Sequence, residues 1–202
     1  MTLTIRDFRP GDEQAANFVC LKTGDHGRDG EPLYREDPDA LARIYVIPYL
    51  KFSPELALMA VDEEGVCGYA LATCDSREFF DRYEVEWRPT LCEQFPAPSG
   101  DPSSWNHVQE VYHLYHNPDY FCPEPYAEYP SHLHIDLLER VQGQGTGRQM
   151  IEQLVARLCA IRSPGVHLGM SDDNEPAYGF YLALGFQELV RHGSAIYMGM
   201  KL

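Results

Sequence analysis

Residues 142–148 form a glycine-rich segment between an apolar strand pattern and the start of an amphipathic helix pattern. Glycine lets the backbone approach a ligand closely, and a helix N-terminus presents unpaired N–H groups at the positive end of its dipole. The segment therefore indicates an anion-binding turn, and a tight turn that only caps the helix is the alternative interpretation. Its spacing matches neither the dinucleotide-binding glycine pattern nor the phosphate-binding P-loop. The residues are Gln142, Gly143, Gln144, Gly145, Thr146, Gly147 and Arg148.

Three titratable residues alternate along the strand pattern that precedes this segment: His132, His134 and Asp136. Successive side chains of a strand point to opposite faces, so these three share one face. Histidine exchanges a proton near neutral pH, which makes the group a candidate for a general base. The alternative is that His132 is a satisfied polar residue at the strand edge and that His134 and Asp136 bond each other only for structure. No third ligand follows the two histidines at a recognisable metal-binding spacing, so we expect no metal.

A second motif, N-x-x-A-x-x-F-Y-x-x-x-G-F, runs from Asn174 to Phe186 along a helix pattern that starts at Pro176. Its Tyr181 is a candidate general acid, because a phenol donates a proton and is still apolar enough for a helix face. The alternative interpretation is one more core aromatic beside Phe180.

The two motifs together resemble the coenzyme A motifs of the GNAT acyltransferase family, in that family's order and spacing. The first is the Q-x-x-G-x-G of residues 142–147, and the resemblance covers residues 131–190 closely. More narrowly, residues 53–75 and 130–138 resemble the acetyltransferase-like C-terminal domain of O-GlcNAcases and its free-standing bacterial relatives. The animal members of that group are generally regarded as catalytically silent.

The resemblance implies a place for each part of acetyl-CoA. The pyrophosphate would lie on the backbone amides of residues 142–148. The pantetheine arm would pair like an added strand with Leu137 and Leu138, and Asn174 would bond the same arm. Tyr181 would protonate the leaving thiolate.

The pair His132 and His134 resembles the paired histidines of arylalkylamine N-acetyltransferases. The connection from strand to loop is one residue shorter here, and a shift of one residue turns every side chain to the other face. The resemblance implies an acetyl-CoA-dependent N-acetyltransferase that acts on a small-molecule amine or amino sugar by direct attack on the thioester. The alternative is a catalytically silent coenzyme A-binding module.

The net charge of the chain restricts the classes of partner that it can bind. The chain has 202 residues, with 16 Lys and Arg against 31 Asp and Glu, for a net charge of −15. Such a field repels phosphate backbones and anionic lipids, so we expect no nucleic acid or membrane partner, and a cationic or amine substrate is favoured.

The six cysteines are scattered and the first residues lack a signal-peptide pattern, which indicates a cytoplasmic protein. The sequence leaves open whether the protein forms a homodimer.

The element order predicts an α/β (α+β) chain with the GNAT fold. Its sheet is mixed, mostly antiparallel, and splayed between strands at 132–138 and 165–170, with helices on both faces. We expect residues 1–202 to form a single GNAT domain with loop insertions at about 23–37 and 95–130. The patterns also predict hairpins at 56–74 and 186–202, a helix that starts at Asp37-Pro38, and irregular chain from Pro89 to Pro130.

Overall fold

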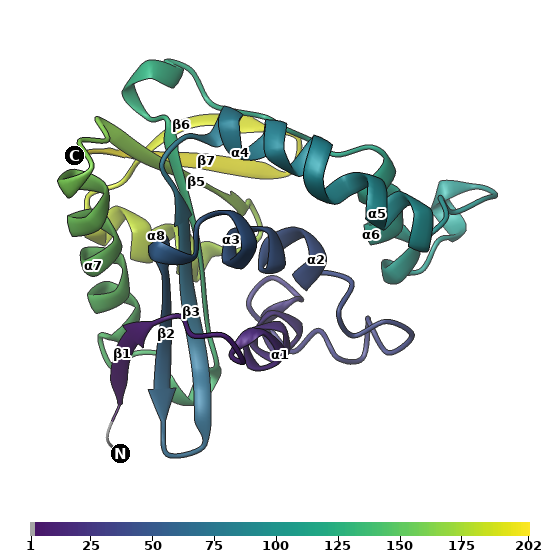
Figure 1. The fold of residues 1–202 in the computed structure, drawn as a ribbon, viewed down its shortest axis with the longest axis horizontal. Helices are drawn as coiled ribbons and strands as arrows, with labels where there is room; N and C mark the ends of the chain where they lie inside the picture. The colour runs from purple at the N-terminus through teal and green to yellow at the C-terminus, as the bar shows by residue number, and fades with distance from the viewer. Residues whose placement is uncertain (1–2) are drawn as a thin grey trace.

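The computed structural model describes residues 3–202, in which seven strands form one open sheet in the order β1-β2-β3-β4-β5-β7-β6 (Figure 1). All neighbouring strands are antiparallel except β4 and β5, which are parallel. The fold class predicted from the sequence is therefore confirmed. The strands are β1 (Thr4–Asp7), β2 (Ala57–Asp62), β3 (Gly65–Thr73), β4 (Ser131–Leu137), β5 (Gly165–Ser171), β6 (Gln187–His192) and β7 (Ala195–Lys201).

The parallel pair β4 and β5 opens after two residues. Only Ser131 with Val166 and His132 with His167 are in register, whereas β4 stays paired with β3 up to Leu137. The second half of β4 therefore has a free backbone edge toward β5, which is the predicted splay.

Helices cover both faces of the sheet. α1 (Glu13–Thr23) packs against β3 and β4, and α7 (Thr146–Ala160) packs against β2, β3 and β4 from the other side (Figure 1). The remaining helices are α2 (Ala42–Tyr45), α3 (Ile47–Phe52), α4 (Ser76–Arg82), the π-helix η2 (Tyr83–Trp87), α5 (Arg88–Gln94), α6 (His107–His116) and α8 (Glu175–Leu184), with short 3₁₀ turns η1 (Pro54–Leu56), η3 (Pro102–Ser104), η4 (Tyr126–Glu128) and η5 (Glu139–Val141). No helix within residues 3–202 is long and apolar enough to cross a membrane.

The helix predicted from Asp37-Pro38 is wrong at its start. The chain from 38 to 41 forms turns, and the helical part begins at Ala42 and breaks at Val46, just before Pro48. The Asp37 carboxylate does not cap a helix because it bonds other groups. It pairs with Arg43 at 2.5 Å and accepts a hydrogen bond from the Tyr112 hydroxyl at 2.9 Å.

The stretch predicted to be irregular contains two helices, α5 and α6. α6 begins with a capping box, in which Asn106 and Gln109 each bond the other's backbone N–H. Its buried residues Val108, Val111 and Tyr115 lie on one face. The sequence therefore contained the capping residues and the apolar spacing of α6. The many prolines before and after it led to the prediction of irregular chain.

Candidate functional site

The glycine-rich segment caps α7. Gly145 is the N-cap residue with φ +83°, and Gly143 has φ +70°. A Cβ atom at either position would meet nothing within 4 Å, so the space above the turn is open. The first intrahelical bond of α7 runs from Gln149 N to Gly145 O, which leaves the preceding N–H groups available to an anion.

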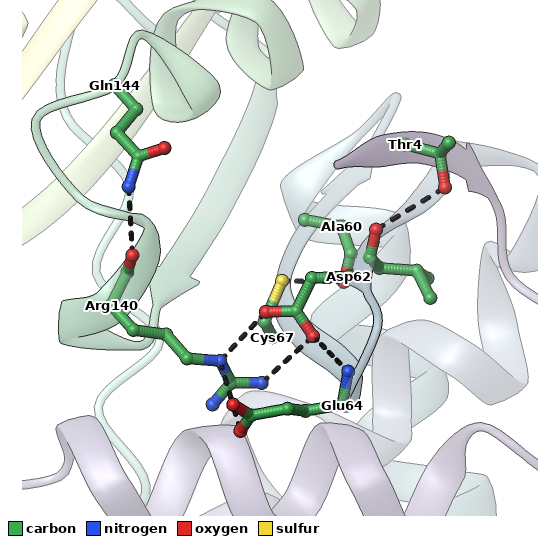
Figure 2. A network of polar contacts seen from close by, with 8 residues as sticks. Thr4, Ala60, Asp62, Glu64, Cys67, Arg140 and Gln144 are labelled. Atoms are coloured by element: carbon green, nitrogen blue, oxygen red, sulfur yellow. Dashed lines mark hydrogen bonds and ion pairs between the residues drawn. The ribbon is translucent and has the colours of Figure 1, made fainter. Parts of the chain in front are cut away.

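An ion pair fixes the chain just ahead of this turn. The Arg140 Nε atom lies 2.8 Å from the buried Asp62 carboxylate on β2, and Gln144 Nε2 donates to Arg140 O at 2.9 Å (Figure 2). Asp62 also accepts from Glu64 N at 2.9 Å. The hydrogen bond from Arg140 lowers the pKa of Asp62 to about 2. The turn is thus tied to the β2–β3 hairpin through one guanidinium.

Of the two residues predicted to hold the pantetheine arm, Leu137 lies on the open edge of β4 and Leu138 does not. Leu138 N donates to Cys67 O on β3 at 2.9 Å, so the Leu138 amide faces away from the splay. Backbone groups alternate in direction along a paired strand, so Ile135 and Leu137 direct theirs to the open side. The Leu137 carbonyl accepts a hydrogen bond from Gln142 Nε2 at 2.7 Å. Ile135 was not among the predicted residues, because only the pairing with β3 shows which edge is free.

Asn174 is the N-cap of α8. Its Oδ1 accepts from Ala177 N at 3.1 Å, whereas its Nδ2 donates to no residue within 3–202 and is available to a ligand. That nitrogen points toward Gly27, where an added Cβ would lie 3.5 Å away. A cavity of about 540 Å³ lies between this helix start and the α1–α2 loop, lined by Asp25, His26, Arg28, Asp173, Asn174 and Pro176.

The β3–β4 register places a polar cluster on the α1 face of the sheet. Tyr69 pairs with Asp136, and Leu71 pairs with His134. The fully buried Tyr69 donates its hydroxyl hydrogen to Asp136 Oδ2, and the same hydroxyl lies 3.2 Å from His134 Nε2. Asp136 Oδ2 lies 3.1 Å from that nitrogen. The other nitrogen of His134, Nδ1, has no hydrogen-bond partner within residues 3–202.

Tyr181 lies on α8, within reach of the negative charge of Asp136. Its side chain is buried against Phe180 and Phe186. Burial raises the pKa of Tyr181, and the negative charge of Asp136 raises it further. The phenol is therefore protonated throughout the physiological pH range.

Comparisons with known sequences and solved structures identify relatives of this chain. No family model matches the chain. It is 28% identical over 189 residues to the rat and mouse proteins described as Protein O-GlcNAcase, an alignment that covers 93% of this chain and 20% of theirs. The crystal structure of SsHAT superposes with a TM-score of 0.91 at 36% identity, covering 100% of this chain and 98% of that one. The chain is a GNAT-like domain of the O-GlcNAcase C-terminal type.

The GNAT-like domain spans about a fifth of the length of the curated relatives it matches. A phosphinothricin acetyltransferase from Sinorhizobium meliloti, solved in complex with AcCoA, shares the fold with a TM-score of 0.57 at 17% identity. That alignment covers 100% of this chain and 89% of the enzyme. The domain therefore has the same fold as this acetyltransferase.

His132 shares the face of His134 but not its surroundings. It is buried beneath α4, where its ring stacks on Phe80 with centroids 5.4 Å apart. Ser76 donates its hydroxyl to Pro130 O, so His132 Nδ1 must donate to Ser76 Oγ, 2.7 Å away. Burial holds the pKa of His132 well below its ordinary value. The domain therefore brings His134 and Asp136 into contact, holds Tyr181 within reach of the Asp136 charge, and keeps His132 apart as a neutral ring.

Sequence reasoning missed Tyr69. It lies in an apolar strand pattern where a tyrosine reads as a core residue, and only the register with β4 places it beside Asp136. No group of three His, Cys, Asp or Glu side chains within residues 3–202 is arranged to hold a metal ion.

Proposed function

We propose that the GNAT-like domain binds acetyl-CoA and transfers the acetyl group to an amine. The observation that carries the proposal is an imidazole in contact with a carboxylate whose charge also reaches a buried phenol. Asp136 lies 3.1 Å from His134 Nε2, and its charge acts on the buried Tyr181 phenol. A general base and a general acid at one place both accelerate acyl transfer from a thioester to an amine.

The residues around the splay fit acetyl-CoA. The open turn at Gly143 and Gly145, with the free amides of the first turn of α7, offers a cradle for a pyrophosphate. The free edge of β4 at Ile135 and Leu137 suits an amide-bearing arm, which would displace the Gln142 side chain from the Leu137 carbonyl. The net charge of −15 does not oppose this strongly, because salt screens distant charges over about 8 Å at physiological ionic strength.

In this proposal His134 acts as the general base and Tyr181 acts as the general acid. Bound acetyl-CoA supplies an acetyl thioester. The acceptor reaches the site as an ammonium, and His134 Nδ1 takes its proton so that the amine becomes a nucleophile. Tyr181 donates its phenolic proton to the departing sulfur, and such general acid help is typically worth about 10²–10⁴-fold in rate.

The acceptor in this proposal is a small-molecule amine or amino sugar. The walls of the cavity beside Asn174 include the carboxylates of Asp25 and Asp173, which would attract a cation, but His134 and Asp136 do not line it. Arg28 lies 3.1 Å from Asp25 and offsets part of that charge.

A thiol-release assay tests the function. Wild-type protein is mixed with acetyl-CoA and a panel of primary amines and amino sugars, and free thiol and acetylated acceptor are both quantified. We expect equal amounts of the two products for at least one acceptor, and a strong loss in the His134→Gln variant. Thiol release that does not depend on any acceptor, or that His134→Gln leaves unchanged, would contradict the proposal.

A catalytically silent coenzyme A-binding module is the second candidate, and one observation favours it. A phenol whose pKa is raised by burial and by Asp136 is a weaker acid than an ordinary tyrosine. Calorimetry separates the two functions, since acetyl-CoA binding without turnover over the whole panel would support the module.

A further inference from the structure

Tyr69 lies between His134 and Asp136, two of the ionisable groups of β4. It stands opposite Asp136 across the β3–β4 ladder, and none of its side chain is exposed. Its hydroxyl donates to Asp136 Oδ2 and also lies 3.2 Å from His134 Nε2. The two rings lie 5.6 Å apart and are tilted by 36°. One phenolic oxygen therefore touches both groups.

The hydrogens of this cluster can be assigned by counting donors. A phenol has a single hydrogen, and Tyr69 gives it to the carboxylate. The contact between the phenolic oxygen and His134 Nε2 then needs its hydrogen from the imidazole. A neutral imidazole carries one N–H, so a hydrogen on Nε2 leaves the lone pair on Nδ1.

We propose that Tyr69 is a positioning residue that links Asp136 to His134 and fixes the His134 hydrogen on Nε2, so that Nδ1 faces the acceptor as the base. This inference rests on the acetyl-transfer function proposed above. In the chain of bonds, Nε2–H donates to the Tyr69 oxygen and Tyr69 O–H donates to Asp136. The carboxylate thereby orients the imidazole through the phenol, in addition to its own 3.1 Å approach to Nε2.

The surroundings of the cluster keep the phenol protonated. Burial raises the pKa of Tyr69 well above its ordinary value, and the charge of Asp136 raises it further. The groups that face the cluster come from every packed element: Cys20 on α1, Tyr45 on α2, His132 on β4 and Tyr181 on α8. Burial raises the pKa of the Cys20 thiol, and the buried His132 is neutral, so Asp136 is the charge that the phenol meets.

The test is nitrogen-15 NMR of the histidine side chains at a pH where His134 is neutral, with the His134 signals assigned from their loss in His134→Gln. We expect the wild type to show a hydrogen on Nε2 and a lone pair on Nδ1. Tyr69→Phe should give a mixture of the two tautomers. The matched control is Tyr115→Phe, which removes another fully buried phenol, one that donates to Ala40 O at 2.7 Å away from this cluster, and it should retain the wild-type tautomer.

Asp136→Ala gives a second readout that does not require Tyr69→Phe to fold. Without the carboxylate the Tyr69 hydrogen is free to turn toward Nε2, so the His134 hydrogen should move to Nδ1. A wild type with the hydrogen on Nδ1 overturns the inference. So does a wild-type tautomer in folded Tyr69→Phe, or one in Asp136→Ala. The tautomer is measured without acetyl-CoA, so failure of acetyl transfer and failure of this inference are separate results.

Discussion

The guanidinium of Arg140 holds the carboxylate of Asp62, with Nε 2.8 Å from Oδ2, although the Asp62 side chain is almost entirely buried. Arg140 belongs to the turn η5, which leads directly into the glycine-rich segment, and Asp62 ends β2. One ion pair therefore sets the position of the proposed pyrophosphate cradle relative to the sheet (Figure 2).

Arg140→Gln should weaken both the fold and the binding of acetyl-CoA. Removing the guanidinium leaves a buried carboxylate without its partner, and because Arg140 is partly exposed we expect a loss of about 2 kcal/mol in the free energy of unfolding. Urea unfolding measures the loss. Arg191→Gln is the control, because its pair with Glu188 lies at the surface and should change stability by less than about 1 kcal/mol. Equal effects of the two substitutions would show that the Arg140 pair has no special role.

The same pair predicts how stability depends on acid. The pKa of Asp62 is about 2 in the folded chain and has an ordinary value of 3.8, so the unfolded chain binds the proton first. This contribution is complete above pH 3.8 and is lost as the pH falls from about 4 to 2. Urea unfolding of wild type and Asp62→Asn over that range checks it. The stability difference between them should shrink with falling pH, and a constant difference would contradict the assignment.

Gly145→Val should harm acetyl-CoA binding. A valine at φ +83° is strained, and its side chain would occupy the open space above the α7 amides. We expect the affinity measured by calorimetry to fall at least about tenfold, or 1.4 kcal/mol. Gly100→Val is the matched control, because Gly100 has φ +89° and open surroundings but lies far along the chain, in the loop before η3. It should share the strain and retain the affinity.

Tyr181→Phe should lower turnover and spare binding. The phenylalanine ring keeps the packing against Phe180 and Phe186, so acetyl-CoA affinity should stay within about threefold, or 0.7 kcal/mol. Turnover should fall at least about a hundredfold if the phenol protonates the thiolate. Tyr178→Phe on the same helix is the control, since its hydroxyl reaches the exposed Glu188. Wild-type turnover in Tyr181→Phe would make Tyr181 a core aromatic only.

The sequence predicted the local parts of the site and missed those that depend on pairing between distant strands. The helix that begins at Thr146 and the helix after Asn174 were predicted, because glycine, capping residues and apolar spacing act within a few residues. Tyr69 and Asp136 are 67 positions apart, and no local pattern specifies which residue of β3 faces which residue of β4.

His132 shows the same limit. The alternation along β4 correctly placed it on the face of His134, but α4 covers that end of the strand. Whether a residue on a given face meets solvent or a ring depends on where a distant helix packs, and Phe79 and Phe80 of α4 lie more than 50 positions earlier in the chain.

A crystal structure of the domain with a non-reactive acetyl-CoA analogue tests the central claim most directly. We expect the pyrophosphate on the amides at the start of α7, the arm along Ile135 and Leu137, and the acetyl carbonyl between the Tyr181 hydroxyl and His134. An analogue bound elsewhere, or one whose acetyl group points away from Asp136, would contradict the account.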